Sequence, residues 1–196
     1  MSMKKTALVA IIIFILLSPL LFLLLSYQFT AFQEKYYSAP ERKEVLDFLQ
    51  ENTEIKANFT ALEVSHLRDV QKVMQFTDYL FYLVFALAVI LGIVLYRKAL
   101  LLKALFYSGI FSISFFALIF LFYFFGFSFL FTVFHQIFFP QGNWLFPADS
   151  LLIQTFPAEF FTRLSGLIFG KAAALSVIAL FLSFYLKIKE TLKNRQ

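Results

Sequence analysis

The sequence predicts an all-α integral membrane protein, a bundle of four transmembrane helices with two extracytoplasmic loop regions. Hydrophobic residues make up 61% of its 196 residues and charged residues only 15%, whereas soluble domains average about 45–50% and about 25%. Four apolar segments are long enough to cross a hydrocarbon core, which takes about 20 helical residues. Basic residues flank these segments in a pattern that predicts their orientation. We therefore expect one membrane domain over residues 1–196.

The first apolar segment covers about residues 7–26 and follows Lys4 and Lys5. A basic start before an apolar run is also typical of a cleaved signal peptide. This apolar run is too long for a signal peptide, and no small-residue cleavage site follows it before Tyr27. We therefore expect an uncleaved anchor, in which Pro19 is tolerated as prolines are in membrane helices.

The other three segments cover about residues 79–96, 104–125 and 164–186. Most of the basic residues lie at the N-terminus, between the second and third segments, and at the C-terminus (Lys4, Lys5, Arg97, Lys98, Lys103, Lys187, Lys189, Lys193, Arg195). Segments rich in lysine and arginine stay in the cytoplasm. Both termini should therefore be cytoplasmic, and the two long loops, about 27–78 and 126–163, should lie outside.

The first outer loop has the composition of a small soluble subdomain and carries 9 of the 12 acidic residues. The stretch Ser38-Ala39-Pro40-Glu41 predicts a helix start, because proline and acidic residues favour the first turn. A second helix is expected over about 59–74. Its helical spacing places five residues on one face directed at the bundle or its lipid boundary (Phe59, Leu62, His66, Val70, Val73).

The second outer loop is long yet almost uncharged. Helical spacing places four phenylalanines on one face beside His135 (Phe127, Phe131, Phe134, Phe138). Pro140 should end this run, and residues 141–143 should form a turn. Ser150, with Asp149, can cap a short helix, and the stretch 157–159 starts the last one. Such a loop is expected in the lipid boundary as a re-entrant or surface helix.

The chain has two histidines, His66 and His135, and both fall in the predicted outer loops. Histidine titrates near neutral pH and is suited to proton transfer at a lipid–water boundary. For His66, spacing alone favours a core histidine that hydrogen-bonds to a neighbour. The alternative is that Asp69, three residues later, holds one ring nitrogen and leaves the other for a substrate.

Three residues near the outer boundary, Trp144, Arg163 and Lys171, are candidates for contact with substrate or lipid. Aromatic rings at this depth usually act as membrane anchors. Long cationic side chains usually reach for lipid headgroups. Stacking on a ligand, or binding a substrate oxygen, is the alternative for each of them.

Motifs for other chemistry do not occur in the sequence. The absence of cysteine excludes disulfides, thiol nucleophiles and thiolate metal sites, and neither His-Glu-x-x-His nor Gly-x-Ser-x-Gly is found. A metal site built from His66, His135, Asp69 and Asp149 is conceivable, but the spacing does not favour it. We expect no metal and no cofactor. Nucleic acid is not indicated either, because the basic residues follow the membrane topology.

The two loops and the order of the spans resemble a known family. The first loop reads Glu-x-x-His-x-x-Asp-Val over residues 63–70, and the second reads Phe-His-Gln-Ile-Phe-Phe-Pro-Gln-Gly-Asn-Trp over residues 134–144. Over essentially the whole chain, this arrangement resembles the lipoprotein intramolecular transacylase (Lit) family of Gram-positive bacteria. The stretch in the second loop is the more specific of the two.

The resemblance implies a reaction on lipidated proteins in the bacterial cell membrane, at a site facing the outer leaflet. An acyl chain moves from the glycerol of a diacylglyceryl-cysteine to the α-amino group of the same N-terminal cysteine, which yields a lyso-form lipoprotein. The expected partners are therefore diacylglyceryl-modified lipoproteins and membrane lipid. Family membership also implies that His66 and His135 form the catalytic pair.

Within that reaction we expect His135 to act as general base and then as general acid, because its loop is predicted to face lipid. His66 would assist or polarise the ester carbonyl, with Asp69 orienting it. Asn143 and the backbone of its turn are candidate donors to the oxyanion. No protein nucleophile is required, since both reacting groups belong to one substrate.

The alternative function is that of a non-catalytic membrane protein whose outer loops bind a lipid or a partner chain. In that case the histidines are structural or sense pH. A hydrolase would need an activated nucleophile or a metal-bound water, for which no motif is found. Transport is not favoured either, because the spans carry almost no ionisable residue at mid-membrane depth.

Overall fold

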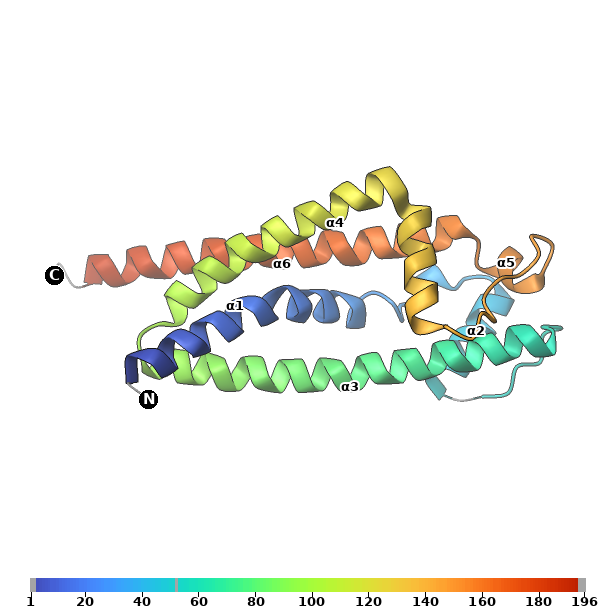
Figure 1. Ribbon diagram of the computed structural model, residues 1–196, viewed down its shortest axis with the longest axis horizontal. Coiled ribbons are helices and arrows are strands. Elements are labelled where there is room, and N and C mark those ends of the chain that lie inside the picture. The colour runs from blue at the N-terminus through green and yellow to red at the C-terminus, as the bar shows by residue number, and fades with distance from the viewer. Residues whose placement is uncertain (1–2, 52, 194–196) are drawn as a thin grey trace. The chain divides into compact units, whose positions relative to one another are not determined.

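The computed structural model describes residues 3–51 and 53–193, and all regular secondary structure in this part of the chain is helical, with no strand. Arg195, from the C-terminal basic group, lies outside the described residues. The elements in chain order (Figure 1) are α1 (Met3–Gln28), η1 (Glu34–Tyr36), α2 (Pro40–Glu51), α3 (Ala61–Arg97), α4 (Leu101–Phe138), α5 (Leu151–Thr155) and α6 (Ala158–Lys193).

Four helices in the described part are long and apolar enough to cross a membrane, as the sequence predicts. They comprise Lys5–Gln28 of α1, the whole of α3, Leu101–Phe124 of α4 and the whole of α6. Their outward side chains are largely apolar, and many large hydrophobic residues are exposed, among them Ile90 and Phe181. An exposed apolar surface of this extent is suited to lipid contact.

The chain forms two compact units, which we call the helical unit and the site unit. The helical unit comprises Met1–Tyr27, Leu80–Leu121 and Ile168–Gln196, and the site unit comprises Gln28–Tyr79 and Phe122–Leu167. The site unit therefore contains nearly all of the two predicted outer loops.

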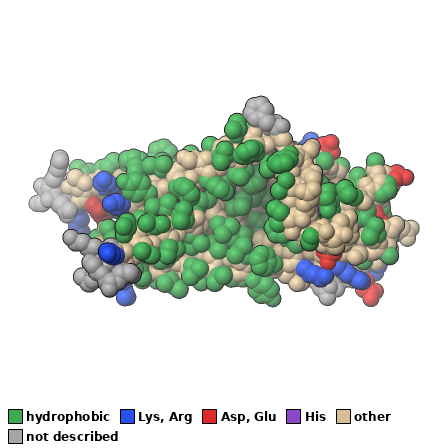
Figure 2. All heavy atoms as spheres, viewed as in Figure 1, with side chains coloured by type: hydrophobic (Ala, Val, Ile, Leu, Met, Phe, Trp, Pro, Cys, Tyr) green, Lys and Arg blue, Asp and Glu red, His purple; other side chains and the backbone are tan. Residues whose placement is uncertain are grey.

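In the helical unit, the basic ends of the helices lie together. Ala10 and Phe14 of α1 share a core with Leu95 of α3 and Ala104 of α4. Helices α4 and α6 approach closely, since a Cβ on Gly109 would lie 2.7 Å from the Cβ of Leu180. The start of α1, the α3–α4 turn and the end of α6 therefore meet at one end of this unit (Figure 1). Hydrophobic side chains cover the face of the unit shown in Figure 2, with lysine and arginine at that end.

Helix α3 differs from the prediction, because the expected outer helix and the second span form one continuous helix of 37 residues. No proline or glycine interrupts it before Gly92. At 1.5 Å per residue it is about 55 Å long, far more than a hydrocarbon core of about 30 Å. Its charged residues all precede Tyr79 or form its end at Arg97. The uncharged stretch 79–96 is thus the part of α3 suited to hydrocarbon, and the charged turns before it extend the helix beyond that stretch.

The buried face of the first turns of α3 is also rotated from the predicted one. Glu63, His66, Leu67 and Gln71 are buried, whereas Leu62, expected to face inward, is 53% exposed. The difference arises because the polar residue Gln71 lies on the buried face, where its Nε2 donates to the carbonyl of Phe48 at 2.7 Å. The spacing of hydrophobic residues alone does not predict such a hydrogen bond.

Helix α4 bends at Gly126, whose φ of −166° and ψ of 45° depart from helical values. The bend separates the long apolar part of α4, Leu101–Phe124, from its final segment 127–138. A turn follows Pro140, in which Gly142 has a φ of +78° that favours glycine. Ser150 then caps α5, its Oγ accepting from the Ile153 amide.

One apolar core holds the site unit together. It combines Tyr37 and residues of α2 with the start of α3 and with α5 (Tyr37, Val45, Leu46, Phe48, Leu67, Leu152, Phe156). The Tyr37 hydroxyl donates to the carbonyl of Ala31 at 2.7 Å, so this buried polar group is satisfied. The core fixes the first turns of α3, which carry His66.

Candidate active site

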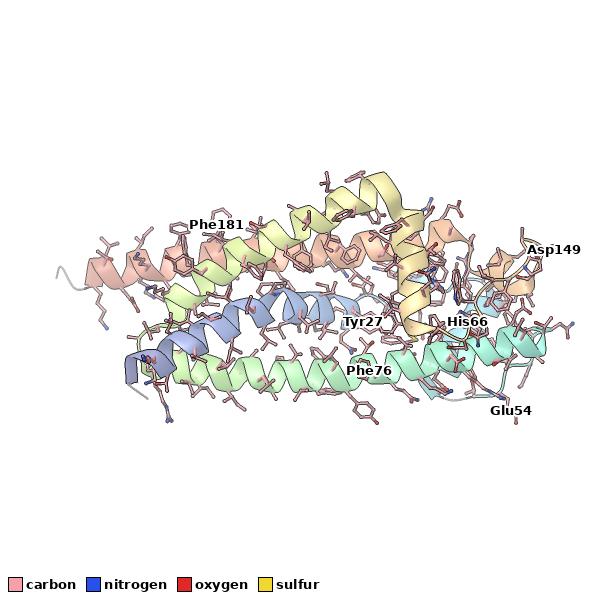
Figure 3. The ribbon with its side chains drawn as sticks, viewed as in Figure 1. Tyr27, Glu54, His66, Phe76, Asp149 and Phe181 are labelled. Carbon is pink, nitrogen blue, oxygen red and sulfur yellow. The ribbon has the colours of Figure 1, made fainter. Side chains whose placement is uncertain are left out.

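The structure brings His66 and His135 together in the site unit, although 68 residues separate them in the sequence. Their ring centroids lie 6.1 Å apart, with an angle of 23° between the ring planes. His66 comes from the second turn of α3, where Figure 3 labels it, and His135 from the last turn of α4. Both are nearly buried, 7% and 8% exposed.

Aromatic rings surround the histidine pair. The ring of Phe139, itself 2% exposed, lies 4.8 Å from that of His66 and 5.5 Å from that of His135. Trp144 lies 4.9 Å from His135, and Phe146 lies 5.7 Å from His66. Trp144 is therefore a wall of this site as well as the interfacial ring that the sequence suggests. The surroundings are apolar and exclude much of the water.

A backbone hydrogen bond sets the tautomer of His135. Its Nδ1 lies 2.8 Å from the carbonyl oxygen of Phe131. A carbonyl only accepts, so Nδ1 carries the proton and donates it. In the neutral ring, Nε2 is then the nitrogen with the free lone pair and is able to accept a proton.

The carboxylate of Asp69 makes no hydrogen bond to His66, which was the alternative interpretation of their spacing. Its carboxylate accepts instead from Lys72 Nζ at 2.9 Å, Gln141 Nε2 at 2.9 Å and Asn143 Nδ2 at 2.8 Å. The hydrogen bond from Lys72, ahead of those from Asn143 and Gln141, lowers the pKa of Asp69 despite its partial burial. Asp69 thus anchors the 141–143 turn on α3.

Asn143 is the residue through which Asp69 acts near His66. The buried Asn143 Oδ1 and the buried His66 Nδ1 each lack a hydrogen bond that meets ordinary distance and angle limits. They are nevertheless close enough that the Asn143 side chain favours the protonated form of His66. The Asp69 carboxylate therefore holds the Asn143 amide, whose oxygen makes no hydrogen bond to His66.

Both histidines are neutral at neutral pH. Burial, reinforced by the nearby His135, lowers the pKa of His66 from 6.5 to about 4, although Asp69 and Asn143 oppose the shift. Burial likewise lowers the pKa of His135, against the opposing hydrogen bond to Phe131. A neutral imidazole with a free ring nitrogen is the form that acts as a base.

Glu63 is a buried residue of this region to which the sequence reasoning assigned no role. It is 1% exposed, and its Oε1 accepts from the amide of Leu152 at 2.8 Å. Its Oε2 accepts from the amide of Thr60 at 2.6 Å, and the Glu63 amide donates back to Thr60 Oγ1. This arrangement is a capping box, and the spacing Thr-x-x-Glu at the start of a helix would have predicted it from the sequence.

The same carboxylate therefore ties the N-terminus of α3 to that of α5. Burial alone raises the pKa of Glu63, but hydrogen bonds from Leu152, Thr60 and Ser150 outweigh it and lower the pKa below its ordinary value. Glu63 is thus a charged link beneath the loop that carries Trp144 and Phe146.

The two cationic candidates fall in different units of the fold. Arg163 belongs to the site unit and lines a separate cavity at the start of α6. Lys171 belongs to the helical unit. Among the described residues, no three histidine, cysteine or carboxylate side chains are grouped as metal ligands would be.

The low pKa of His66 predicts a loss of stability in acid. Between pH 6.5 and about 4 the unfolded chain binds a proton at His66 and the folded chain does not, so the free energy of unfolding falls as the pH falls. We expect the Tm of the detergent-solubilised protein to drop across this window, and to drop less for a His66→Phe variant. Equal slopes for the two proteins would contradict the assignment.

The fold and its four apolar helices define an all-helical membrane protein with a buried histidine pair. The family model of the lipoprotein intramolecular transacylase Lit matches residues 8–161. The chain therefore belongs to the lipoprotein intramolecular transacylase family and is an acyltransferase. No curated protein sequence matches it.

Solved structures share the fold over almost the whole chain. The membrane-integral lipoprotein intramolecular transacylase Lit from Bacillus cereus is similar with a TM-score of 0.85 at 19% identity, covering 96% of this chain and 99% of that one. Two variants of the Bacillus cereus protein, with one histidine replaced by arginine or by alanine, give TM-scores of 0.81 and 0.79 at 18% identity. These cover 97% and 96% of this chain, and 96% and 97% of the variant chains.

Proposed function

We propose that this acyltransferase moves an acyl chain from the glycerol of a diacylglyceryl-cysteine to the α-amino group of the same cysteine. The product is a lipoprotein with an N-acylated, S-monoacylglyceryl-modified first residue. The observation that carries the proposal is the histidine pair, neutral and enclosed by aromatic rings, in a chain of this family. Its partners are diacylglyceryl lipoproteins presented by the surrounding lipid.

The reaction needs one proton moved and no protein nucleophile. The free amine attacks the ester carbonyl, a C–N bond forms, and Nε2 of His135 takes the proton that the nitrogen sheds. The C–O bond to glycerol then breaks, and His135 returns the proton to the departing glycerol oxygen. Amine and ester belong to one molecule, so holding them together supplies much of the rate enhancement.

His66 serves in this scheme as the second imidazole, facing the ester carbonyl. Asp69 and Asn143 are positioning residues, because the Asp69 carboxylate accepts from the Asn143 amide and the Asn143 side chain favours the protonated form of His66. Asn143 Nδ2 has two hydrogens and donates one to Asp69, so the other remains for the carbonyl oxygen as charge develops there. The aromatic wall formed by Phe139 and Trp144 keeps water from competing with the amine.

The topology that suits this reaction has both termini in the cytoplasm and the site unit at the outer leaflet. The supporting observation is that the basic ends of the four helices gather at one end of the helical unit. Segments rich in lysine and arginine stay in the cytoplasm. Lipoproteins anchored in the outer leaflet of a bacterial cell membrane would then reach the histidines by moving within the lipid bilayer.

The test is mass spectrometry of a lipoprotein N-terminal peptide from a host that otherwise makes only the diacylglyceryl form. Co-expression of this chain is expected to convert that peptide to the N-acyl, S-monoacylglyceryl form, with no change in total mass but with fragments that carry one acyl chain on nitrogen. An unchanged peptide, with the chain verified in the membrane, would favour a non-catalytic lipid- or partner-binding protein.

The positioning role of Asn143 predicts a partial defect. Asn143→Leu removes the link between Asp69 and His66, and we expect conversion to slow by about 10- to 100-fold, the range for residues that orient a catalytic ligand. Asn143→Gln is expected to recover part of the rate. Gln141→Leu is the matched control, because it removes the hydrogen bond from Gln141 to Asp69 and leaves Asn143 unchanged. Equal losses in Asn143→Leu and Gln141→Leu would contradict the role.

A further inference from the structure

A second cavity lies within the site unit, away from the histidines, where η1 and α2 meet the start of α6. Its volume is about 490 Å³. The lining is part cationic, from Lys35, Arg42 and Arg163, and part apolar, from Phe160, Leu164 and Leu167. Neither histidine lines the cavity, and the ring of Phe160 contacts neither histidine ring.

Three cationic side chains line the cavity, together with only one carboxylate, that of Glu159. Among the described residues, none of these three cations lies at salt-bridge distance from a carboxylate. Clustered cations without counter-charges are the usual footprint of an anion site.

Arg42 is held in place for this role. Its Nε donates to the carbonyl of Thr155 at 2.6 Å, and its guanidinium carbon lies 5.1 Å from the ring centre of Phe160. The two Nη groups make no hydrogen bond among the described residues. A planar guanidinium fixed by stacking, with two free donor groups, matches the geometry of phosphate oxygens.

The lining changes from cationic to apolar along one face of α6. Phe160, Arg163, Leu164 and Leu167 follow at helical spacing, so they share this face. Beyond Leu167 the helix continues as an apolar run in which Lys171 is the only charged residue before Lys187. A phosphate at Arg163 would therefore have its attached hydrocarbon beside the two leucines, in the order that a phospholipid requires.

We propose that this cavity binds the phosphate headgroup of an anionic phospholipid. The volume lies in the ordinary range for ligand pockets, about 300–1,000 Å³, and holds a phosphate, a glycerol and the first methylenes, with the rest of the chains outside. The apolar leucine wall distinguishes this ligand from free phosphate. The site is independent of the acyl transfer, since it shares no residue with the histidine pair.

Native mass spectrometry of the full chain in detergent tests the proposal, with dioleoylphosphatidylglycerol, dioleoylphosphatidylcholine or inorganic phosphate added. We expect the phosphatidylglycerol to bind with clear preference over the phosphatidylcholine. The double variant Lys35→Gln, Arg163→Gln should bind it about 30-fold more weakly, since each cation near an anionic lipid contributes about 1 kcal/mol, or about fivefold.

The matched control is Lys43→Gln, Lys56→Gln, which removes two exposed cations that do not line the cavity and should bind as the wild type does. Ser38→Glu is a second probe, since it adds a negative charge to the cavity from an exposed position and should also weaken binding. Equal affinity for the two lipids, or equal loss in the control, would overturn the proposal. Full displacement of the lipid by inorganic phosphate would assign the cations to free phosphate instead.

Discussion

The His135→Ala variant is expected to convert a diacylglyceryl lipoprotein at least about 100-fold more slowly than the wild type, within the range of about 10²–10⁴ for a lost general base. The reason is geometric: the backbone carbonyl of Phe131 holds the proton on Nδ1, so Nε2 is the basic nitrogen facing the reaction. Alanine removes that nitrogen, and the phenylalanine and tryptophan rings next to it carry no basic group. The measurement is the rate of appearance of the N-acylated peptide by mass spectrometry.

The matched control is Gln136→Ala, which changes the neighbouring exposed residue of the same helix turn and should leave the rate unchanged. Circular-dichroism melting of both variants separates lost chemistry from lost folding. His66→Phe, which keeps a ring against Phe139, should also be strongly impaired. Wild-type conversion by a folded His135→Ala protein would remove His135 from the mechanism.

The Glu63→Ala variant is expected to lose about 3 kcal/mol of unfolding free energy, because hydrogen bonds to a charged group contribute about 1.5–3 kcal/mol each. The carboxylate accepts from the amides of Thr60 and Leu152 and from the Thr60 hydroxyl. Without it, the buried Leu152 amide at the start of α5 has no partner. Denaturant unfolding in a fixed detergent, followed by circular dichroism, measures the loss.

Glu54→Ala is the control for this experiment, because Glu54 is exposed and has no hydrogen-bond partner among the described residues. Its unfolding free energy should match that of the wild type within about 0.5 kcal/mol. Glu63→Gln should lie between Glu63→Ala and wild type, since an amide oxygen accepts the same bonds without the charge. A change in Glu63→Ala no larger than that of the control would show that the link between α3 and α5 is not stabilising.

Several local elements follow directly from the amino acids. The start of α2 at Pro40, the cap at Ser150 and the start of α6 after Pro157 were predicted from residues whose backbone preferences or side-chain hydrogen bonds act within one or two turns. The number of apolar helices is predictable for a similar reason, since hydrocarbon thickness sets their length.

The features that the sequence did not predict depend on interactions between distant parts of the chain. The continuous α3 and its rotated face depend on packing against α2, where Gln71 bonds to Phe48. Asp69 accepts hydrogen bonds from Gln141 and Asn143, more than 70 residues away, rather than from the histidine one turn earlier. Sequence spacing describes neighbours on one helix, and it carries no information on which loop will cover that helix.

The sequence by itself determined that this is an all-helical protein with four membrane-capable helices, and it marked both histidines as candidates for proton transfer. Composition and periodicity suffice for this because burial in lipid and helical hydrogen bonding are local requirements. Only the tertiary structure decided that the two rings stack within one aromatic enclosure, that a backbone carbonyl sets the tautomer of His135, and that Glu63 joins two helix ends. Each of these depends on segments that meet only when the chain has folded.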